Sequence, residues 1–364
     1  MIRHCTPLAA DAAFDRIGAD GVWWAVLQPA DASSRRLIQL CGGYFATYLI
    51  TGVLVKYFQG KADAGFPGMS EAQFLVYSTT GGTVLCLAIV LWMGWWRLPK
   101  GVNHGRLLLA MIPAGMCTAV VIPSTTLLYS LPITLMVAMV IMRGSIIVVS
   151  RAVDAIQIRQ GMVTRVVFWE ENVAVGFSLC AVALHLFFTT GGIVFTAAAA
   201  AILAAYVGSY AIRIYLMNWF KNTQAAGTLD NRIWFGVEQL VASTVIALVM
   251  ALILGVRPEN KVLIDIADAV YSPHPRWFAA IGAGSVYGIV AFFSVFIFMF
   301  KGRTATFAGL ANRLTSLVAG TGATLVSAWC FGTSWPKVQD WQSLALIFVA
   351  VVFLSRAERR RASG

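Results

Sequence analysis

Residues 137–156, VAMVIMRGSIIVVSRAVDAI, form an apolar segment about as long as one membrane crossing, with an arginine, Arg143, near its middle. A charged side chain at the centre of a bilayer costs about 2.5–3.5 kcal/mol on insertion scales. Such a charge normally faces a polar partner or a water-filled cavity rather than lipid. The segment therefore predicts a membrane helix that holds one buried charge for a structural or functional reason.

Apolar runs of similar length recur along the whole chain. Of its 364 residues, 59% are hydrophobic and 12% are charged. The runs are about twice as long as the strands of a membrane barrel and lack their alternating pattern, so we predict an all-α integral membrane protein. The net charge of +11 does not indicate nucleic-acid binding, because the Lys and Arg residues lie mainly in short loops and at the chain ends.

Turn residues and charged clusters divide the sequence into ten candidate transmembrane helices. The predicted crossings are 37–57, 71–96, 106–128, 131–151, 170–188, 193–219, 234–255, 277–300, 304–330 and 339–356. The connection between 255 and 277 contains RPENK and YSPHPR, and its prolines predict a capped loop rather than a helix.

Lys and Arg are distributed unevenly between the two sides of the predicted membrane. With the N-terminus inside, about 18 lie on that side and about 6 on the other, a bias that marks the cytoplasmic side. We expect both termini in the cytoplasm, most simply at the inner membrane of a cell, although an organelle membrane fits equally well. Residues 1–36 contain four aspartates and no apolar core of a signal peptide, so we expect a cytoplasmic extension there.

Ten crossings with both termini inside require the second half to enter the membrane in the opposite sense to the first. This is the geometry of two inverted five-helix repeats. We expect the first repeat at 37–188, the second at 193–356 and a basic cytoplasmic tail at 357–364. A homodimer is one possible assembly.

Two stretches of the sequence resemble the drug/metabolite transporter superfamily. Residues 312–356, NRLTSLVAGTGATLVSAWCFGTSWPKVQDWQSLALIFVAVVFLSR, resemble its last helical pair. Residues 128–152, LYSLPITLMVAMVIMRGSIIVVSRA, are similar to the third-to-fourth helix region of its nucleotide-sugar-transporter-like branch, where an MRG or LRG element is familiar. The resemblance implies a transporter of small organic solutes, built from two inverted five-helix repeats around a central cavity with alternating access.

Two arginines lie deep within predicted spans. Arg143 lies about 11 residues, roughly 17 Å, into its helix, and Arg313 lies about 9 residues, roughly 14 Å, into a helix that enters from the other side. They are therefore expected at similar depth. Each could bind backbone carbonyls or a carboxylate and tie helices together, or could bind an anionic group of a solute, for which a guanidinium is well suited. Arg213 is expected to reach the cytoplasmic surface and to be structural.

Five tyrosines within the spans could stack on a solute ring, or could serve as packing and membrane-interface anchors. They are Tyr44, Tyr48, Tyr206, Tyr210 and Tyr287.

Few acidic residues lie near the spans. The titratable candidates within them are Glu238 and His185, too few to favour proton coupling over exchange or facilitated diffusion. We expect the acidic groups at the cytoplasmic helix ends to pair at the surface with nearby arginines. The acidic residues are Asp154, Glu170 and Glu171, and the arginines are Arg151, Arg159 and Arg165.

No catalytic motif is recognisable, and we expect neither an enzyme, a metal site nor a cofactor. The sequence predicts a secondary transporter of a small polar or anionic organic metabolite, with the solute and membrane lipid as its partners. Two alternatives stay open. One is an exporter of neutral amino acids or amphipathic compounds, in which both mid-span arginines are structural, and the other is a lipid-handling or purely structural membrane protein.

Overall fold

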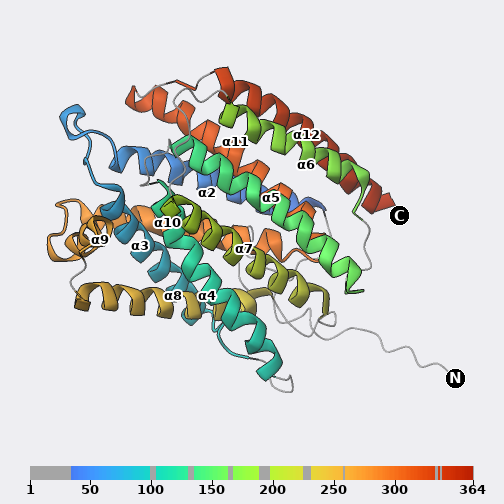
Figure 1. The fold of residues 1–364 in the computed structure, drawn as a ribbon, viewed down its shortest axis with the longest axis horizontal. Helices are drawn as coiled ribbons and strands as arrows, with labels where there is room; N and C mark the ends of the chain where they lie inside the picture. Colours follow the sequence, from blue (N-terminus) through green and yellow to red (C-terminus); the bar gives the residue numbers. More distant parts are fainter. Residues whose placement is uncertain are drawn as a thin grey trace, which may run out of the picture.

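The protein folds into a bundle of long α-helices (Figure 1). The computed structural model describes residues 34–98, 104–129, 135–162, 167–187, 197–223, 231–256, 259–332, 335–336 and 338–363. Within these residues ten helices are long and two are short. The long ones are α2 (Ser34–Phe58), α3 (Glu71–Trp92), α4 (His104–Tyr129), α5 (Leu135–Arg159), α6 (Trp169–Phe187), α7 (Ala197–Thr223), α8 (Asn231–Val256), α10 (Trp277–Phe298), α11 (Ala305–Phe331) and α12 (Val338–Ser363); the short ones are η1 (Ala62–Ala64) and α9 (Lys261–Tyr271).

The predicted all-α class is confirmed, but several helix ends differ from the prediction. α3 stops at Trp92 because the chain turns at Gly94, whose φ of 66° is left-handed. α5 continues to Arg159, and α12 continues to Ser363, so the basic tail extends a helix. The predicted N-terminal extension lies outside the described residues as far as 33.

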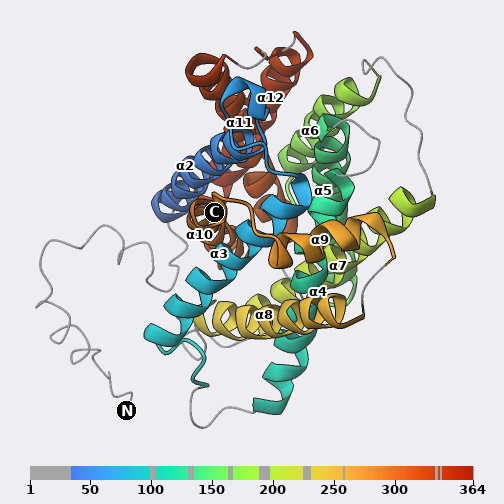
Figure 2. The ribbon, with the colours of Figure 1, turned by 90° about the vertical axis from the view of Figure 1, so that its left-hand side faces the viewer.

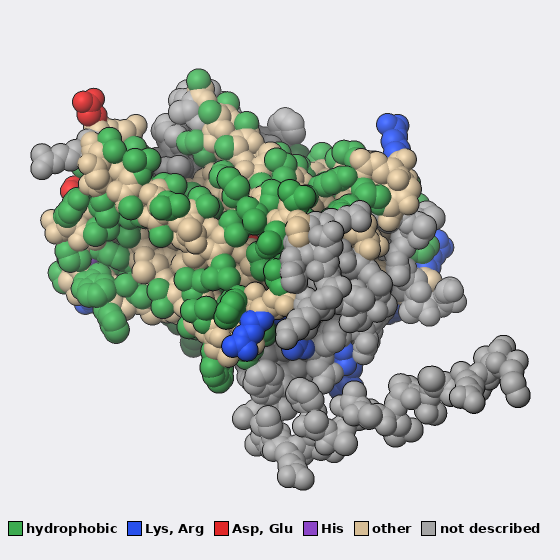
Figure 3. Space-filling view, turned by 90° about the horizontal axis from the view of Figure 1, so that it is seen from below, with side chains coloured by type: hydrophobic (Ala, Val, Ile, Leu, Met, Phe, Trp, Pro, Cys, Tyr) green, Lys and Arg blue, Asp and Glu red, His purple; other side chains and the backbone are tan. Residues whose placement is uncertain are grey.

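The described helices are those of a multi-pass membrane protein. Seven are long and apolar enough to span a membrane: Arg35–Phe58, Glu71–Trp92, Leu107–Thr125, Ala200–Thr223, Asn231–Val256, Trp277–Phe298 and Ala305–Phe331. Large apolar side chains such as Leu109 and Leu252 are exposed on the outside of the bundle. Figure 3 shows hydrophobic side chains spread over most of the described part of one face, with charged groups at its margins. A lipid environment accounts for this surface, which water would not favour.

Helices distant in sequence pack against one another throughout the bundle. α10 packs on α3 and α2, α11 on α2, α4 on α7 and α8, and α6 on α12, which lies beside it in Figure 1. The α3–α10 crossing is close because glycines face each other: a Cβ on Gly284 would lie 2.2 Å from the carbonyl oxygen of Ser78. Small residues at such crossings let membrane helices pack through their backbones.

The connection expected to be a loop before residue 277 contains the helix α9. The prediction was wrong because Pro273 and Pro275 both lie beyond the helix, and Asn260 caps its start by accepting the N–H of Val262 at 3.0 Å. Figure 2 shows α9 crossing one end of the bundle. The Tyr77 hydroxyl of α3 anchors it by donating to the carbonyl of Ala269 at 2.8 Å.

The turn between α10 and α11 is held by side chains from the first half of the chain. The carboxylate of Asp154 accepts the backbone N–H of Ala305 at 2.8 Å and also that of Thr306, both in the first turn of α11. Glu171 accepts the Thr304 hydroxyl at 2.9 Å. These contacts satisfy N–H groups that a helix start leaves without intrahelical partners, and they place negative charge at the positive end of the helix dipole.

The acidic residues at these helix ends are therefore not surface groups. Asp154, Glu170 and Glu171 are fully buried, and Glu170 pairs with Arg360 of α12 at 2.8 Å. The prediction of surface pairs with nearby arginines was wrong for these carboxylates because α11 and α12 fold back over them. Arg165 lies outside the described residues.

Replacing Asp154 with Ala tests the cap on α11. The change leaves two buried N–H groups without acceptors, so we expect a loss of about 1.5–3 kcal/mol of stability, seen as a lower melting temperature in detergent. Asp268→Ala, at an exposed position on α9, is the matched control and should melt like the wild type. Equal melting of the two variants would show that the cap contributes nothing.

Candidate functional site

The seven residues singled out in the sequence lie together inside the bundle. They come from five helices, two in the first half of the chain and three in the second. We call them the tyrosine–arginine cluster: Tyr44 and Tyr48 on α2, Arg143 on α5, Tyr206 and Tyr210 on α7, Tyr287 on α10 and Arg313 on α11.

Arg143 holds the α2 side of the cluster. Its Nη2 donates to the hydroxyl of Tyr48 at 2.8 Å, and the rings of Tyr44 and Tyr48 lie 5.5 Å apart. α11 passes beside the guanidinium at Gly320, where a Cβ would lie 3.7 Å from Nη1. Only 5% of Arg143 is exposed, so its charge is withdrawn from the protein surface.

Arg313 holds the α7 side of the cluster. Its guanidinium lies 4.9 Å from the ring centroid of Tyr210, and the ring of Tyr206 lies 4.9 Å from that of Tyr210. Arg313 is 8% exposed, and its Nε and Nη2 have no hydrogen-bond partner among the described residues. Buried donors of this kind are rare in folded proteins, and here they leave a guanidinium edge available to a ligand.

Tyr44 and Tyr287 connect the two sides. Tyr44 interacts electrostatically with both Arg143 and Arg313, and its hydroxyl lies 3.5 Å from Oδ1 of Asn312. Tyr287 is within electrostatic range of Arg313. The structure thus brings the two mid-span arginines of the sequence analysis to a common centre, although it does so through tyrosines.

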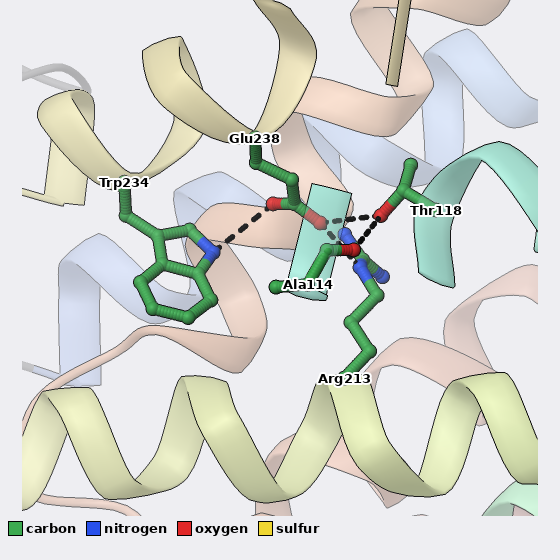
Figure 4. Close-up of polar contacts among 5 residues, drawn as sticks. All are labelled: Ala114, Thr118, Arg213, Trp234 and Glu238. Carbon is green, nitrogen blue, oxygen red and sulfur yellow. Dashed lines mark hydrogen bonds and ion pairs between the residues drawn. The ribbon is translucent and has the colours of Figure 1, made fainter. Parts of the chain in front are cut away.

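A buried ion pair adjoins the cluster. Arg213 donates through Nε to Oε1 of Glu238, whose Oε2 accepts Trp234 Nε1–H at 3.0 Å (Figure 4). Thr118 lies 2.6 Å from Oε1 of Glu238 and 3.0 Å from the carbonyl of Ala114, and its single proton serves one of these acceptors at a time. Glu238 is fully buried.

The expectation that Arg213 reaches the surface was wrong. It is 5% exposed, because Glu238 on α8 holds its guanidinium inside the bundle. Sequence spacing gave no sign of this pair, since α7 and α8 must each be rotated correctly for the two side chains to meet. One available signal was the spacing of Trp234 and Glu238, which places them on the same face of α8.

The side chains of the cluster suit an anionic organic ligand. Guanidinium donors bind carboxylates and phosphates well, and tyrosine rings pack against apolar or aromatic groups while offering a hydroxyl. In the part of the chain that the structure describes, no group of three or more His, Cys, Asp or Glu is placed to hold a metal ion. The side chain of His185 lies outside that part.

Comparison with known proteins supports the fold alone. No family model matches the chain, and no curated protein matches it. A crystal structure described simply as that of a protein is similar over 88% of this chain and 98% of its own, with a TM-score of 0.57 and 16% sequence identity. At this sequence identity the similarity concerns the arrangement of the helices and gives no information about the function.

Two leucine substitutions distinguish the two kinds of buried arginine. Arg213→Leu leaves Glu238 buried without its charge partner, so we expect a loss of about 3–5 kcal/mol. Arg313→Leu removes a buried charge that has no carboxylate partner, so stability should be unchanged or higher. Melting temperatures of the two purified variants in the same detergent measure the difference, and the reverse order would contradict the assignment.

Proposed function

We propose that the protein is a secondary transporter of the drug/metabolite type, and that it moves a small polar or anionic organic metabolite by alternating access. The observation that carries this proposal is Arg313, whose buried Nε and Nη2 have no acceptor among the described residues, although its guanidinium also interacts with Tyr210. A buried guanidinium is costly in a membrane span unless something else compensates it, and an anionic solute supplies that compensation when bound. The tyrosine–arginine cluster is then the solute site.

The pattern of helix packing supports ten crossings in two inverted repeats at 37–188 and 193–356. If α2–α6 correspond in order to α7, α8, α10, α11 and α12, the contacts form matched sets. α2 on α11 matches α7 on α5, α2 on α10 matches α7 on α4, and α3 on α10 matches α8 on α4. A two-fold relation between the halves produces such exchanges, and transporters of this design bind solutes where the halves meet.

The alternatives are less well supported by the site. An exporter of neutral or amphipathic compounds would leave Arg313 as a structural residue, yet its Nε and Nη2 bind no described group. A lipid-handling protein would need a groove open to acyl chains. Glu238 is tied to Arg213, so exchange or facilitated diffusion fits better than proton coupling through that carboxylate.

The distribution of basic residues predicts that both termini lie in the cytoplasm. A green fluorescent protein fused to the C-terminus should fluoresce in intact cells, because it folds poorly when exported unfolded. A cysteine introduced at exposed Ser272, beyond α9, should be labelled by an impermeant reagent added from outside. Labelling from the inside alone would reverse the topology.

Substitutions at the two cluster arginines test the solute site. We expect Arg313→Leu and Arg143→Leu to abolish both binding and uptake of the solute, and Arg313→Lys to weaken binding, because Lys keeps the charge but loses the planar fork. Arg159→Leu removes an exposed charge at the end of α5 and should bind normally. A panel of anionic metabolites supplies the ligand, since one present at 100 times its Kd adds about 2.7 kcal/mol of stability. Normal transport by Arg313→Leu would refute the proposal.

A further inference from the structure

One face of α11 carries polar and small residues from the tyrosine–arginine cluster towards the end of the helix. Arg313, Gly320, Thr324 and Ser327 follow one another at intervals of seven, four and three residues, which keeps them on a single face. Gly320 and Thr324 are partly exposed. Ser327 is fully buried, and its hydroxyl has no hydrogen-bond partner among the described residues. This polar stripe extends over roughly 21 Å, and the buried hydroxyl in it indicates a site for water or a ligand.

Two neighbouring helices place positive charge along the polar stripe. Lys56, near the end of α2, donates to the hydroxyl of Thr324 at 3.1 Å. Arg143 of α5 lies beside Gly320, where a Cβ would be 3.7 Å from its Nη1. Gly320 lies roughly 10 Å along the helix from Arg313, and Thr324 roughly 6 Å further. Lys56, Arg143 and Arg313 therefore form a series of three positive charges that leads from one end of the bundle to its centre.

The helices that hold these three charges carry almost no carboxylate. α2 and α11 contain no Asp or Glu, and α5 contains only Asp154, which binds N–H groups at the opposite end of α11. α7 and α10 contain none either, and Glu238 of α8 is held by Arg213. An anion that follows the polar stripe therefore meets positive charge at each step. Among the described side chains, the other acidic groups near the Lys56 end lie on different elements: Asp63 on η1, Glu71 on α3, Glu259 before α9, and Asp265 and Asp268 on α9.

We propose that Lys56 is a second, outer binding site for the anionic solute, and that the polar stripe is the route from it to the tyrosine–arginine cluster. This inference rests on the proposed function and adds an entry site to it. With both termini in the cytoplasm, α2 ends on the outer side, so the solute meets Lys56 first. The group that binds there is a carboxylate, sulfonate or phosphate.

The geometry of the polar stripe suits the passage of an anion. The hydroxyl of Thr324 positions the ammonium of Lys56 on the stripe without adding a negative charge. From there the anionic group passes to Arg143 and then to Arg313. Successive charges of one sign between low-dielectric walls raise the local concentration of anions and exclude cations.

The route is tested with a thiol placed beside Arg143. Gly320→Cys has room, because a Cβ there makes ordinary contact with Arg143, and Cys330→Ser removes an exposed thiol nearby in the sequence. Two impermeant reagents of similar size are added to intact cells: sulfonatoethyl methanethiosulfonate, an anion, and trimethylammonioethyl methanethiosulfonate, a cation. Mass spectrometry gives the labelling rate at residue 320, which is divided by the rate of the same reagent with free cysteine. The anion should label at least about ten-fold faster than the cation.

Substitutions at Lys56 test the entry site. Lys56→Gln removes the charge but can still donate to Thr324, so we expect the anion to label residue 320 about two- to five-fold more slowly. Lys56→Arg keeps the charge and should keep the rate. Lys61→Gln removes an exposed charge at the same end of the bundle and is the matched control, with an unchanged rate. Added salt should reduce the advantage of the anion without any substitution at Lys56, because it screens exposed charges.

The outcomes separate this inference from the proposed function. If neither reagent reaches residue 320 from outside, or if the cation labels it as fast as the anion, the route is overturned. If Lys56→Gln and Lys61→Gln label alike, Lys56 is not an entry site. Anion binding at the cluster, measured on Arg313→Leu as above, stands in each of these cases. Normal transport by Arg313→Leu refutes the solute site itself, and this inference with it, whatever the labelling rates.

Discussion

A guanidinium within a membrane bundle must be met by protein groups, because lipid offers it neither charge nor hydrogen-bond acceptors. Three arginines impose this requirement at the centre of the present structure, and each meets it differently. Arg213 has a carboxylate, Arg143 has a tyrosine hydroxyl, and Arg313 has the face of an aromatic ring. These contacts fix the rotation of α7 about its axis, because α7 must place Tyr210 against Arg313 of α11 and Arg213 against Glu238 of α8.

Different parts of the bundle are held together by different contacts. At the α3–α10 crossing, backbones approach through glycines and leave no room for side chains. At the centre, large polar side chains separate the helices, and their hydroxyl and guanidinium groups form the cluster. Near the α10–α11 turn, the buried carboxylates of Asp154 and Glu171 join the two halves, and Lys221 of α7 donates to the carbonyls of Phe298 and Arg303 within the second half.

The all-α class and most of the long helices could be predicted from the sequence, because each membrane helix is marked by its own apolar run and by the turn residues at its ends. The cluster was readable for the same reason, since Arg143, Arg313 and the tyrosines stand out in apolar surroundings. Side-chain pairs between helices could not be predicted. Glu238 and Arg213, for example, meet only when α7 and α8 are each rotated so that these side chains face one another. Burial of Asp154 was missed because a carboxylate beside arginines in sequence resembles a surface group, whereas its partners are backbone N–H groups far along the chain.

The Asp154 cap on α11 also constrains the order in which the helices can pack during synthesis. Its carboxylate precedes the N–H of Ala305 by 151 residues, so it leaves the ribosome long before the helix that it serves. Until α11 is present, the carboxylates of Asp154 and Glu171 lack these partners and need water or lipid headgroups instead. The second half supplies one cap of α11, since Thr304 accepts the Phe307 N–H, but the N–H groups of Ala305 and Thr306 take their acceptor from the first half. Each half of the protein therefore provides hydrogen-bond partners for the other, and these contacts can form only after α11 has been synthesised.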